Sequence, residues 1–314
     1  MLEAEHALET RTDKARIAVF TKNMTNQNLQ AFRLGANRVA ARCGASLSHR
    51  VPAQGDDAAQ QIELLASVLT ERPDVILLGP AEDKALEPIV ERINDAQIPI
   101  VNFASRMTAG KFVSYVGADD VNMGILAGHY LLSRTRDSGA VVIMEGPQTT
   151  STGRDRTRGF KTALAEFPGL RLLASVEGKY HQRDASEAMS KVINEFGQID
   201  AVLCANDSMA MGVLDALDHV GRSALVVGIN GTIQAARAIQ QNRLLASVDY
   251  NGFTMGCIGT EAAVRIARGL AVPSQILMPT TVVSRSNVGA WLCPVEERPC
   301  PAWEQVIRVD GRGG

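Results

Sequence analysis

The segment PDVILLGP, residues 73–80, decides the fold, because it holds an uninterrupted apolar run bounded by proline and glycine. A second run of this kind, AVVIM at residues 140–144, stands further along the chain. Continuously apolar strands are typical of parallel sheets that are covered by helices on both faces. The two runs therefore predict buried parallel sheets.

Short β-branched runs alternate with longer amphipathic stretches outward from these two segments. The predicted strands are 17–21, 45–51, 75–79, 98–103, 112–116, 140–144, 170–176, 201–205, 224–229, 245–248 and 280–283. The predicted helices are 28–43, 57–71, 84–95, 122–135, 156–166, 184–195, 208–219, 233–241 and 254–268. A strand followed by a helix, repeated in this way, predicts βαβ units and an α/β fold with parallel sheets.

The strand–helix pattern runs once from residue 17 to about 117 and restarts at 140, which predicts two similar doubly wound lobes. No linker rich in glycine, serine or proline separates the halves, so we expect a hinge at which the chain crosses several times between the lobes. We assign 15–117 plus 251–281 to the N-terminal lobe. The C-terminal lobe then takes 118–250 plus 282–314, including an irregular tail.

The length and composition agree with two globular lobes. The chain has 314 residues, and domains average about 150 residues. Lys plus Arg is 32 and Asp plus Glu is 34, giving a net charge of −2; this balance argues against a nucleic-acid partner. No apolar stretch approaches the ~20 residues of a membrane helix. Residues 1–16 are charged and lack the apolar core of a signal peptide, so the protein is either intracellular or a mature form.

The five cysteines do not decide the compartment. Cys43, Cys204 and Cys257 stand singly in apolar or helical patterns, which are typical of buried thiols. Cys293 and Cys300 flank a loop rich in Pro, Glu and Arg, and we interpret this pair as a candidate disulfide. Zinc is disfavoured there, because no CxxC motif or histidine is near.

Polar side chains follow seven of the predicted strands. They lie in the segments 22–28, 104–106, 145–160, 177–184, 206–208, 230–232 and 249–251. Ligands of open parallel sheets bind outside the carboxyl ends of the strands. A ring of amides, hydroxyls, Arg, Lys and Tyr at these ends suits a small polar molecule such as a sugar or polyol.

The chain resembles the ribose/galactose-type periplasmic sugar-binding proteins of ABC importers, and it is similar to the effector domains of LacI-type repressors, which share that fold. The resemblance covers residues 15–288 and rests on the order of its motifs. These motifs are IAVFTKNMTN (17–26), PDVILLGP (73–80), INDAQIPIVNFASR (93–106), FVSYVGADDVNMGILAGHYL (112–131), STGRDRTRGFKTAL (151–164), IDAVLCANDSMAMGVLDAL (199–217), ALVVGING (224–231) and LLASVDYNGFTMG (244–256). The implied fold is that of a type I periplasmic binding protein.

The resemblance implies ligand contacts in the second half of the chain. Arg154 takes the place of a family arginine that clamps ring oxygens and hydroxyls, and we expect Arg156 to be structural or solvated. The other implied contacts in this half are Tyr180, Asn206, Asn230, Asp249 and Tyr250. Asn206 could instead cap the helix that follows it, in which case the ligand role falls away; we expect Asp207 or Ser208 to cap.

The first half departs from the family pattern. The implied contacts there are Lys22, Asn26, Asn28, Asn102, Ser105 and Arg106. Ribose-type relatives carry aromatics where this chain has Asn28 and Leu29, and the family's Asp-Arg pair aligns with Ser105 and Arg106 only after a one-residue shift. Aromatic residues make up 4% of the chain, and both tryptophans lie in the tail. We therefore expect a site poor in stacking surface, for a flexible polyol or an unusual sugar rather than ribose.

The hypothesis is a solute-binding protein of an ABC transporter, which captures a small neutral polyhydroxylated ligand between two lobes by hinge closure. The alternative is the ligand-sensing effector domain of a LacI-type regulator. No nucleophile–base pair, phosphate-binding loop or metal-ligand spacing stands in the sequence, so we expect no enzyme activity, no cofactor and no metal. The expected partner is a membrane ABC permease, with no nucleic acid. We expect a monomer in the periplasm, as a mature form without its signal sequence.

Overall fold

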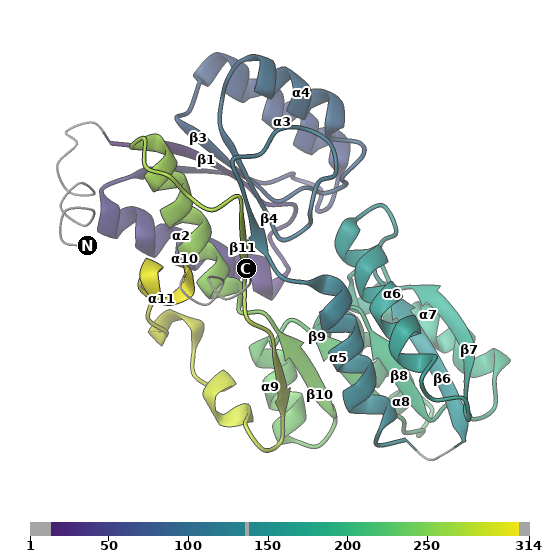
Figure 1. Ribbon diagram of the computed structural model, residues 1–314. Helices are drawn as coiled ribbons and strands as arrows, with labels where there is room; N and C mark the ends of the chain where they lie inside the picture. Colours follow the sequence, from purple (N-terminus) through teal and green to yellow (C-terminus); the bar gives the residue numbers. More distant parts are fainter. Residues whose placement is uncertain (1–13, 136–137, 308–314) are drawn as a thin grey trace. The chain divides into compact units, whose positions relative to one another are not determined.

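The computed structural model describes residues 14–135 and 138–307. These residues form two α/β units, each built on one six-stranded sheet (Figure 1). Unit 1 contains the described residues 14–117, 252–278 and 298–307. Unit 2 contains 118–135, 138–251 and 279–297.

The sheet of unit 1 is parallel throughout its described pairs. Its strands are β1 (Arg16–Phe20), β2 (Ser46–Arg50), β3 (Val75–Leu78), β4 (Ile100–Phe103), β5 (Ser114–Gly117) and β11 (Gln275–Leu277), in the order β11-β5-β4-β3-β1-β2. Each residue of β3 is fully buried, as its apolar run predicts. The chain moves from β1 to β2 on one side and then to β3 on the other, which makes the carboxyl end of β1 a switch point where ligands of such sheets bind.

Helices cover this sheet. They are α2 (Gln27–Cys43), α3 (Ala58–Glu71), α4 (Glu87–Asp95) and α10 (Gly252–Ala267), and α11 (Trp303–Ile307) packs on α10. Figure 1 shows α2 and α10 side by side, and their contact depends on glycine, because a Cβ at Gly256 would lie 2.0 Å from the carbonyl oxygen of Phe32. Phe32 stacks on Phe103 of β4 with a ring-centroid distance of 3.9 Å, which joins the helix layer to the sheet.

The sheet of unit 2 repeats the same winding. Its strands are β6 (Gly139–Glu145), β7 (Leu170–Glu177), β8 (Ala201–Cys204), β9 (Leu225–Ile229), β10 (Ala246–Asp249) and β12 (Thr281–Ser284), in the order β12-β10-β9-β8-β6-β7. All described pairs are parallel except β10 with β12, which is antiparallel. The helices are α5 (Asp120–Leu132), α6 (Ser151–Leu164), α7 (Gln182–Glu195), α8 (Asp207–His219) and α9 (Ile233–Gln240). The switch point lies at β6, between β7 and β8.

The prediction of two similar doubly wound lobes is confirmed, and one strand was missed. β11 joins the edge of the first sheet beside β5, where no strand was expected. It has only three residues, QIL, at the rim of the sheet. A strand this short shows no periodicity in the sequence, so only its pairing with β5 reveals it.

The tail after β12 is divided between the two units. The short helices η1 (Val288–Trp291) and η2 (Val295–Glu297) lie in unit 2, whereas α11 lies in unit 1. The assignment of 282–314 to the C-terminal lobe is therefore wrong for residues 298–307. The cause is packing on α10: Trp303 is 7% exposed, and the guanidinium of Arg265 lies 4.5 Å from its ring centroid.

The predicted disulfide between Cys293 and Cys300 is wrong. Cys300 is bonded instead to Cys257 of α10, with a Cα–Cα distance of 5.8 Å. Cys293 remains a thiol, and its Sγ lies 3.7 Å from the Glu297 carboxylate within unit 2. The packing of the tail on α10 brings Cys300 to Cys257. Cys293, seven positions before Cys300, lies in unit 2. Closeness in sequence was therefore the wrong criterion.

Among the helices of 14–135 and 138–307, none combines the length and apolarity required to cross a membrane. The same residues contain no cluster of three or more His, Cys, Asp or Glu side chains that could hold a metal ion.

Candidate ligand-binding site

The buried Arg156 lies among the carboxyl ends of the strands of unit 2. Its Nε donates to Asp120 Oδ1 at 2.8 Å, and its Nη1 donates to the carbonyl oxygen of Ala205 at 2.8 Å and to Asn230 Oδ1 at 3.3 Å. The guanidinium carbon lies 5.6 Å from the ring centroid of Tyr250. Ala205, Asn230 and Tyr250 directly follow β8, β9 and β10, so one guanidinium joins three neighbouring carboxyl ends.

Close helix packing places this arginine. A Cβ at Gly124 of α5 would lie 2.4 Å from the carbonyl oxygen of Arg156, and a Cβ at Gly159 would lie 2.2 Å from the carbonyl oxygen of Val121. The two glycines therefore let α5 and α6 approach backbone to backbone. This approach brings Asp120, in the first turn of α5, to Arg156, in the second turn of α6.

Burial sets the electrostatics of the cluster. It raises the pKa of the Asp120 carboxyl above its usual range, although the charge of Arg156 acts in the opposite direction. Burial alone lowers the pKa of Arg156. The Asp120 carboxylate, together with the Tyr180 and Tyr250 side chains, outweighs that effect and raises the pKa, so the guanidinium stays charged. Burial also raises the pKa of the Tyr250 hydroxyl to about 12, which keeps it a neutral donor and acceptor.

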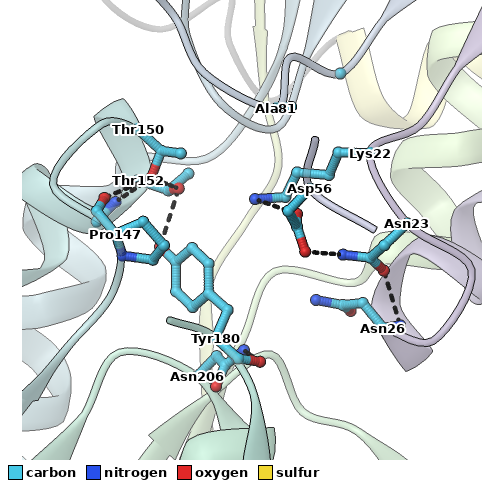
Figure 2. Close-up of polar contacts among 12 residues, drawn as sticks. Lys22, Asn23, Asn26, Asp56, Ala81, Pro147, Thr150, Thr152, Tyr180 and Asn206 are labelled. Atoms are coloured by element: carbon cyan, nitrogen blue, oxygen red, sulfur yellow. Dashed lines mark hydrogen bonds and ion pairs between the residues drawn. The ribbon is translucent and has the colours of Figure 1, made fainter. Parts of the chain in front are cut away.

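A second set of contacts in unit 2 joins Tyr180 to its neighbours (Figure 2). The Tyr180 hydroxyl donates to Thr152 Oγ1 at 3.0 Å, and its ring packs on Gly146, where a Cβ would meet it at 2.5 Å. Tyr180 has a positive φ of 64°, a strained conformation for a bulky residue. Asn206 Nδ2 donates to the Tyr180 carbonyl at 3.2 Å and helps to hold this turn.

Asn206 is the cap of α8, the structural alternative considered for it. Its Oδ1 accepts from the backbone N–H of Met209 at 2.8 Å. The expectation that Asp207 or Ser208 caps the helix is wrong, because Asp207 is the first helical residue and its carboxylate accepts from Ser247 Oγ and the Thr232 N–H. Asn206 therefore lies at the end of β8 and also joins the start of α8 to the turn at Tyr180, through its oxygen and its nitrogen.

The two arginines of α6 differ in burial, and the one that lies at the strand ends is Arg156, not Arg154. Arg154 Nη1 donates to the carbonyl oxygen of Gln148 at 2.9 Å in an exposed position. It lines an open surface hollow together with Arg158 and Lys161. Arg156 is 4% exposed and points at the strand ends. Positions 154 and 156 lie about 200° apart on a helix of 3.6 residues per turn, so only one of them can face the sheet.

Asp249 closes the turn after β10. Its Oδ1 accepts from the backbone N–H of Asn251 at 2.7 Å, and its Oδ2 accepts from Trp291 Nε1 at 2.7 Å. Asn251 has a positive φ of 54°, which this bond helps to hold. Tyr250 lies between these two residues, so the turn determines where its side chain begins.

The strand ends of unit 1 carry a separate polar network after β1 (Figure 2). Lys22 Nζ lies 3.5 Å from Asp56 Oδ1, and Asn23 Nδ2 donates to Asp56 Oδ2 at 2.8 Å. Asn23 Oδ1 accepts from the N–H of Asn26 at 3.0 Å. Arg33 of α2 supports the loop, because its Nη1 donates to the carbonyl oxygen of Asn23 at 3.0 Å.

Asn26 and Asn28 lie at the start of α2. Asn26 is its cap, since its side-chain oxygen accepts from the Asn28 N–H at 2.9 Å. Asn28 is 6% exposed and lies against the start of α10, where a Cβ at Gly252 would be 2.0 Å from its Oδ1. Asn28 thus packs against α10, and its expected contact with a ligand stays a prediction.

Of the expected residues around β4, Asn102 lies within the strand, and Ser105 and Arg106 follow it. Asn102 Nδ2 donates to the carbonyl oxygens of Leu78 and Ser105, at 3.0 and 2.9 Å, and its Oδ1 accepts from the Met107 N–H. Ser105, whose carbonyl oxygen accepts one of these bonds, is buried. Arg106 is exposed; its Nη2 donates to Gln275 Oε1 at 2.7 Å across the β5–β11 edge. These residues fix the edge of the sheet.

Sequence reasoning missed four residues of the two networks: Asn23, Asp56, Asp120 and Arg156. Periodicity could have found Arg156, because the buried positions of α6 include 152, 156, 160 and 163, a helical spacing. Asp120 directly follows Asp119, the cap of α5. A carboxylate at the start of a helix is already explained by the helix dipole, so the sequence gives no reason to assign Asp120 to the site. Only the packing of α5 on α6 separates their roles.

Several named proteins are similar to this chain over most of its length. Ribose import binding protein RbsB of Escherichia coli is 26% identical over 263 residues, covering 83% of this chain and 88% of that protein. The D-ribose/D-allose-binding protein of Pseudomonas aeruginosa is 29% identical, covering 85% and 86%. The structure of an ABC transporter periplasmic solute-binding protein from Actinobacillus succinogenes with bound D-allose superposes with a TM-score of 0.83 at 26% identity, covering 88% of this chain and 100% of that one.

A match to a family model extends over residues 5–271 and carries the description Periplasmic binding protein domain. This span includes both sheets except β11 and β12, and it contains Arg156, Asp120 and the network around Asp56. The chain belongs to the periplasmic binding protein family.

Proposed function

We propose that this chain is the solute-binding component of an ABC importer and that it binds a small neutral sugar or polyol. The observation that carries the proposal is the buried Arg156 guanidinium at the ends of β8, β9 and β10, with Asn230 and Tyr250 beside it. The names of the relatives support the ligand class, since they specify ribose and allose, and a further relative, from Mycolicibacterium smegmatis, is named a xylitol-binding protein.

Hydroxyl groups are the chemistry that these side chains fit. The guanidinium has five N–H donors in a fixed plane, a geometry that suits the oxygens of vicinal hydroxyls. Asn and Tyr both donate and accept, as vicinal hydroxyls require. An analogue that lacks one hydroxyl would leave a buried partner unsatisfied, which is the source of selectivity.

The proposal includes hinge closure. A ligand that bonds to groups of both units favours the arrangement in which both sets of bonds are made, and its differential affinity then drives the change. In unit 1 the proposed contributors are Lys22, Asn23 and Asn26, and in unit 2 they are Arg156 and Tyr250.

The proposed setting is the periplasm, where the liganded monomer docks on a membrane ABC permease. The proposed role is binding without chemistry, so ligand recovered from the protein should be unchanged by mass and NMR spectrum.

The test is a thermal-shift screen of pentoses, hexoses and polyols followed by calorimetry, because a bound ligand raises the melting temperature by mass action. Arg156→Lys should weaken ligand binding by about 1.5–3 kcal/mol, the scale of hydrogen bonds to a charged group. Arg154→Lys on the outer face of α6 is the matched control and should bind like wild type. Equal losses in the two variants, or no stabilisation by any polyhydroxylated compound, would overturn the proposal.

A further inference from the structure

Among the residues that the structure describes, the Arg156 guanidinium at the strand ends of unit 2 forms its ion pair with Asp120. Asp120 Oδ1 lies 2.8 Å from Arg156 Nε, and the two side chains are 8% and 5% exposed. The neighbouring carboxylates are used elsewhere: Asp119 accepts from the Asn122 N–H, and Asp155 lies 2.9 Å from Arg158. Asp120 is therefore the carboxylate in direct contact with Arg156, whereas the buried Asp207 carboxylate interacts with this arginine only electrostatically and is bonded to Ser247 and Thr232.

Unit 1 shows the same arrangement independently. The Lys22 ammonium at the end of β1 lies 3.5 Å from Asp56 Oδ1, with the lysine side chain 12% exposed. In each unit, a mostly buried cation at a strand end thus has a carboxylate beside it. The adjacent carboxylate lowers the attraction of each cation for an anion.

We propose that Asp120 is a charge-selectivity residue, whose carboxylate neutralises Arg156 so that unit 2 accepts the hydroxyls of a neutral ligand and rejects the corresponding sugar acid. The inference rests on the proposed function, since it concerns the same site. A ligand carboxylate at Arg156 would either lie next to Asp120, as a like charge in a water-poor site, or displace it and leave it buried without a partner. Both outcomes weaken the acid relative to the neutral compound.

The role of Asp120 is separable from helix capping. Asp119 is the cap of α5, and its Oδ1 accepts from Asn122 N at 3.0 Å in an exposed position. Asparagine caps helices as well as aspartate does. Asp119→Asn therefore makes the same change of charge one residue away without touching Arg156.

The experiment compares neutral compounds with their acids by calorimetry. The probes are D-ribose, D-allose, xylitol and myo-inositol, set against D-ribonate, D-gluconate and D-glucuronate, at neutral pH and fixed ionic strength. Wild type should bind its best neutral probe about 100-fold or more tightly than any of the acids, the cost expected for an uncompensated buried charge. Asp120→Asn should reduce that ratio about 10-fold or more, while Asp119→Asn keeps the wild-type ratio.

The outcomes are distinguishable from failure of the proposed function. If wild type binds neither class, the proposed function fails. If it binds neutral and acidic probes within tenfold of each other, or if Asp120→Asn keeps the wild-type ratio, the proposed function stands and the selectivity role is overturned. Circular dichroism shows whether Asp120→Asn folds; should it not fold, Asp120→Ser is measured in its place, under the same criterion.

Discussion

Trp291 Nε1 donates a hydrogen bond to Asp249 Oδ2 at 2.7 Å, and this bond joins the tail to the end of β10. Trp291 lies outside the 5–271 family match, so the family pattern could not have indicated it. The same carboxylate holds the N–H of Asn251 through Oδ1. A residue of the tail thus supports the turn that carries Tyr250.

Replacing this indole should loosen the turn. Trp291→Phe keeps the ring but removes the donor, and we expect a loss of about 1–2 kcal/mol in the free energy of unfolding, measured in urea. Ligand affinity should fall several-fold, because the turn that carries Tyr250 loses one of its two bonds to Asp249. Trp303→Phe in unit 1 is the control, expected to leave affinity unchanged. The chain has only two tryptophans, so each variant leaves one fluorescent reporter.

The disulfide predicts a defined thiol count. Titration of the unfolded protein without reductant should detect three thiols, those of Cys43, Cys204 and Cys293, and five after reduction. The double variant Cys257→Ser/Cys300→Ser should lose roughly 2–4 kcal/mol of stability. Cys293→Ser should unfold like wild type. Five thiols before reduction would show that the Cys257–Cys300 bond is absent.

The contact between α5 and α6 should not tolerate a methyl group. Gly124→Ala places a Cβ 2.4 Å from the Arg156 carbonyl oxygen, which forces the helices apart and moves Asp120 from Arg156. We expect a loss of about 1–3 kcal/mol in stability, the usual cost of overpacking, together with weaker ligand binding. Gly197→Ala is the matched control, because no atom lies within 4 Å of its added Cβ. Equal melting temperatures for the two variants would contradict the close packing.

Asp207 predicts a pH dependence of stability. Burial raises the pKa of its carboxyl, and the hydrogen bonds from Ser247 and Thr232 oppose that rise. Its unfolded pKa is about 3.9, so the folded state binds more protons above this pH. The contribution of Asp207 to stability is therefore fully present below about pH 4 and is lost as the pH rises through the raised folded pKa.

Asparagine at this position does not titrate. The melting temperature of Asp207→Asn, relative to wild type, should therefore increase between pH 4 and pH 8, whatever the constant cost of the altered hydrogen bonds. Ser208→Ala, one residue on, should show a difference that does not change with pH. A relative melting temperature of Asp207→Asn that falls with rising pH would contradict the raised pKa.

The sequence predicted where most residues of the candidate site lie, but it predicted few of the contacts that they make. Tyr180, Asn206, Asn230 and Tyr250 do lie at the strand ends of unit 2, because a residue that follows a parallel strand is carried there by the sheet. Their roles were not predictable. Asn206 is a helix cap as well, and the choice between Arg154 and Arg156 depended on which face of α6 is buried.

The sequence by itself determined the alternation of buried strands and helices, the two similar lobes and the edge of each sheet at which polar residues gather. These follow from local patterns of two or 3.6 residues, which a single strand or helix already contains. The tertiary structure alone decided that Arg156 meets Asp120, that Cys300 meets Cys257 and that the tail reaches both units. Each of these depends on segments far apart in the chain, whose meeting is set by helix packing and not by local sequence.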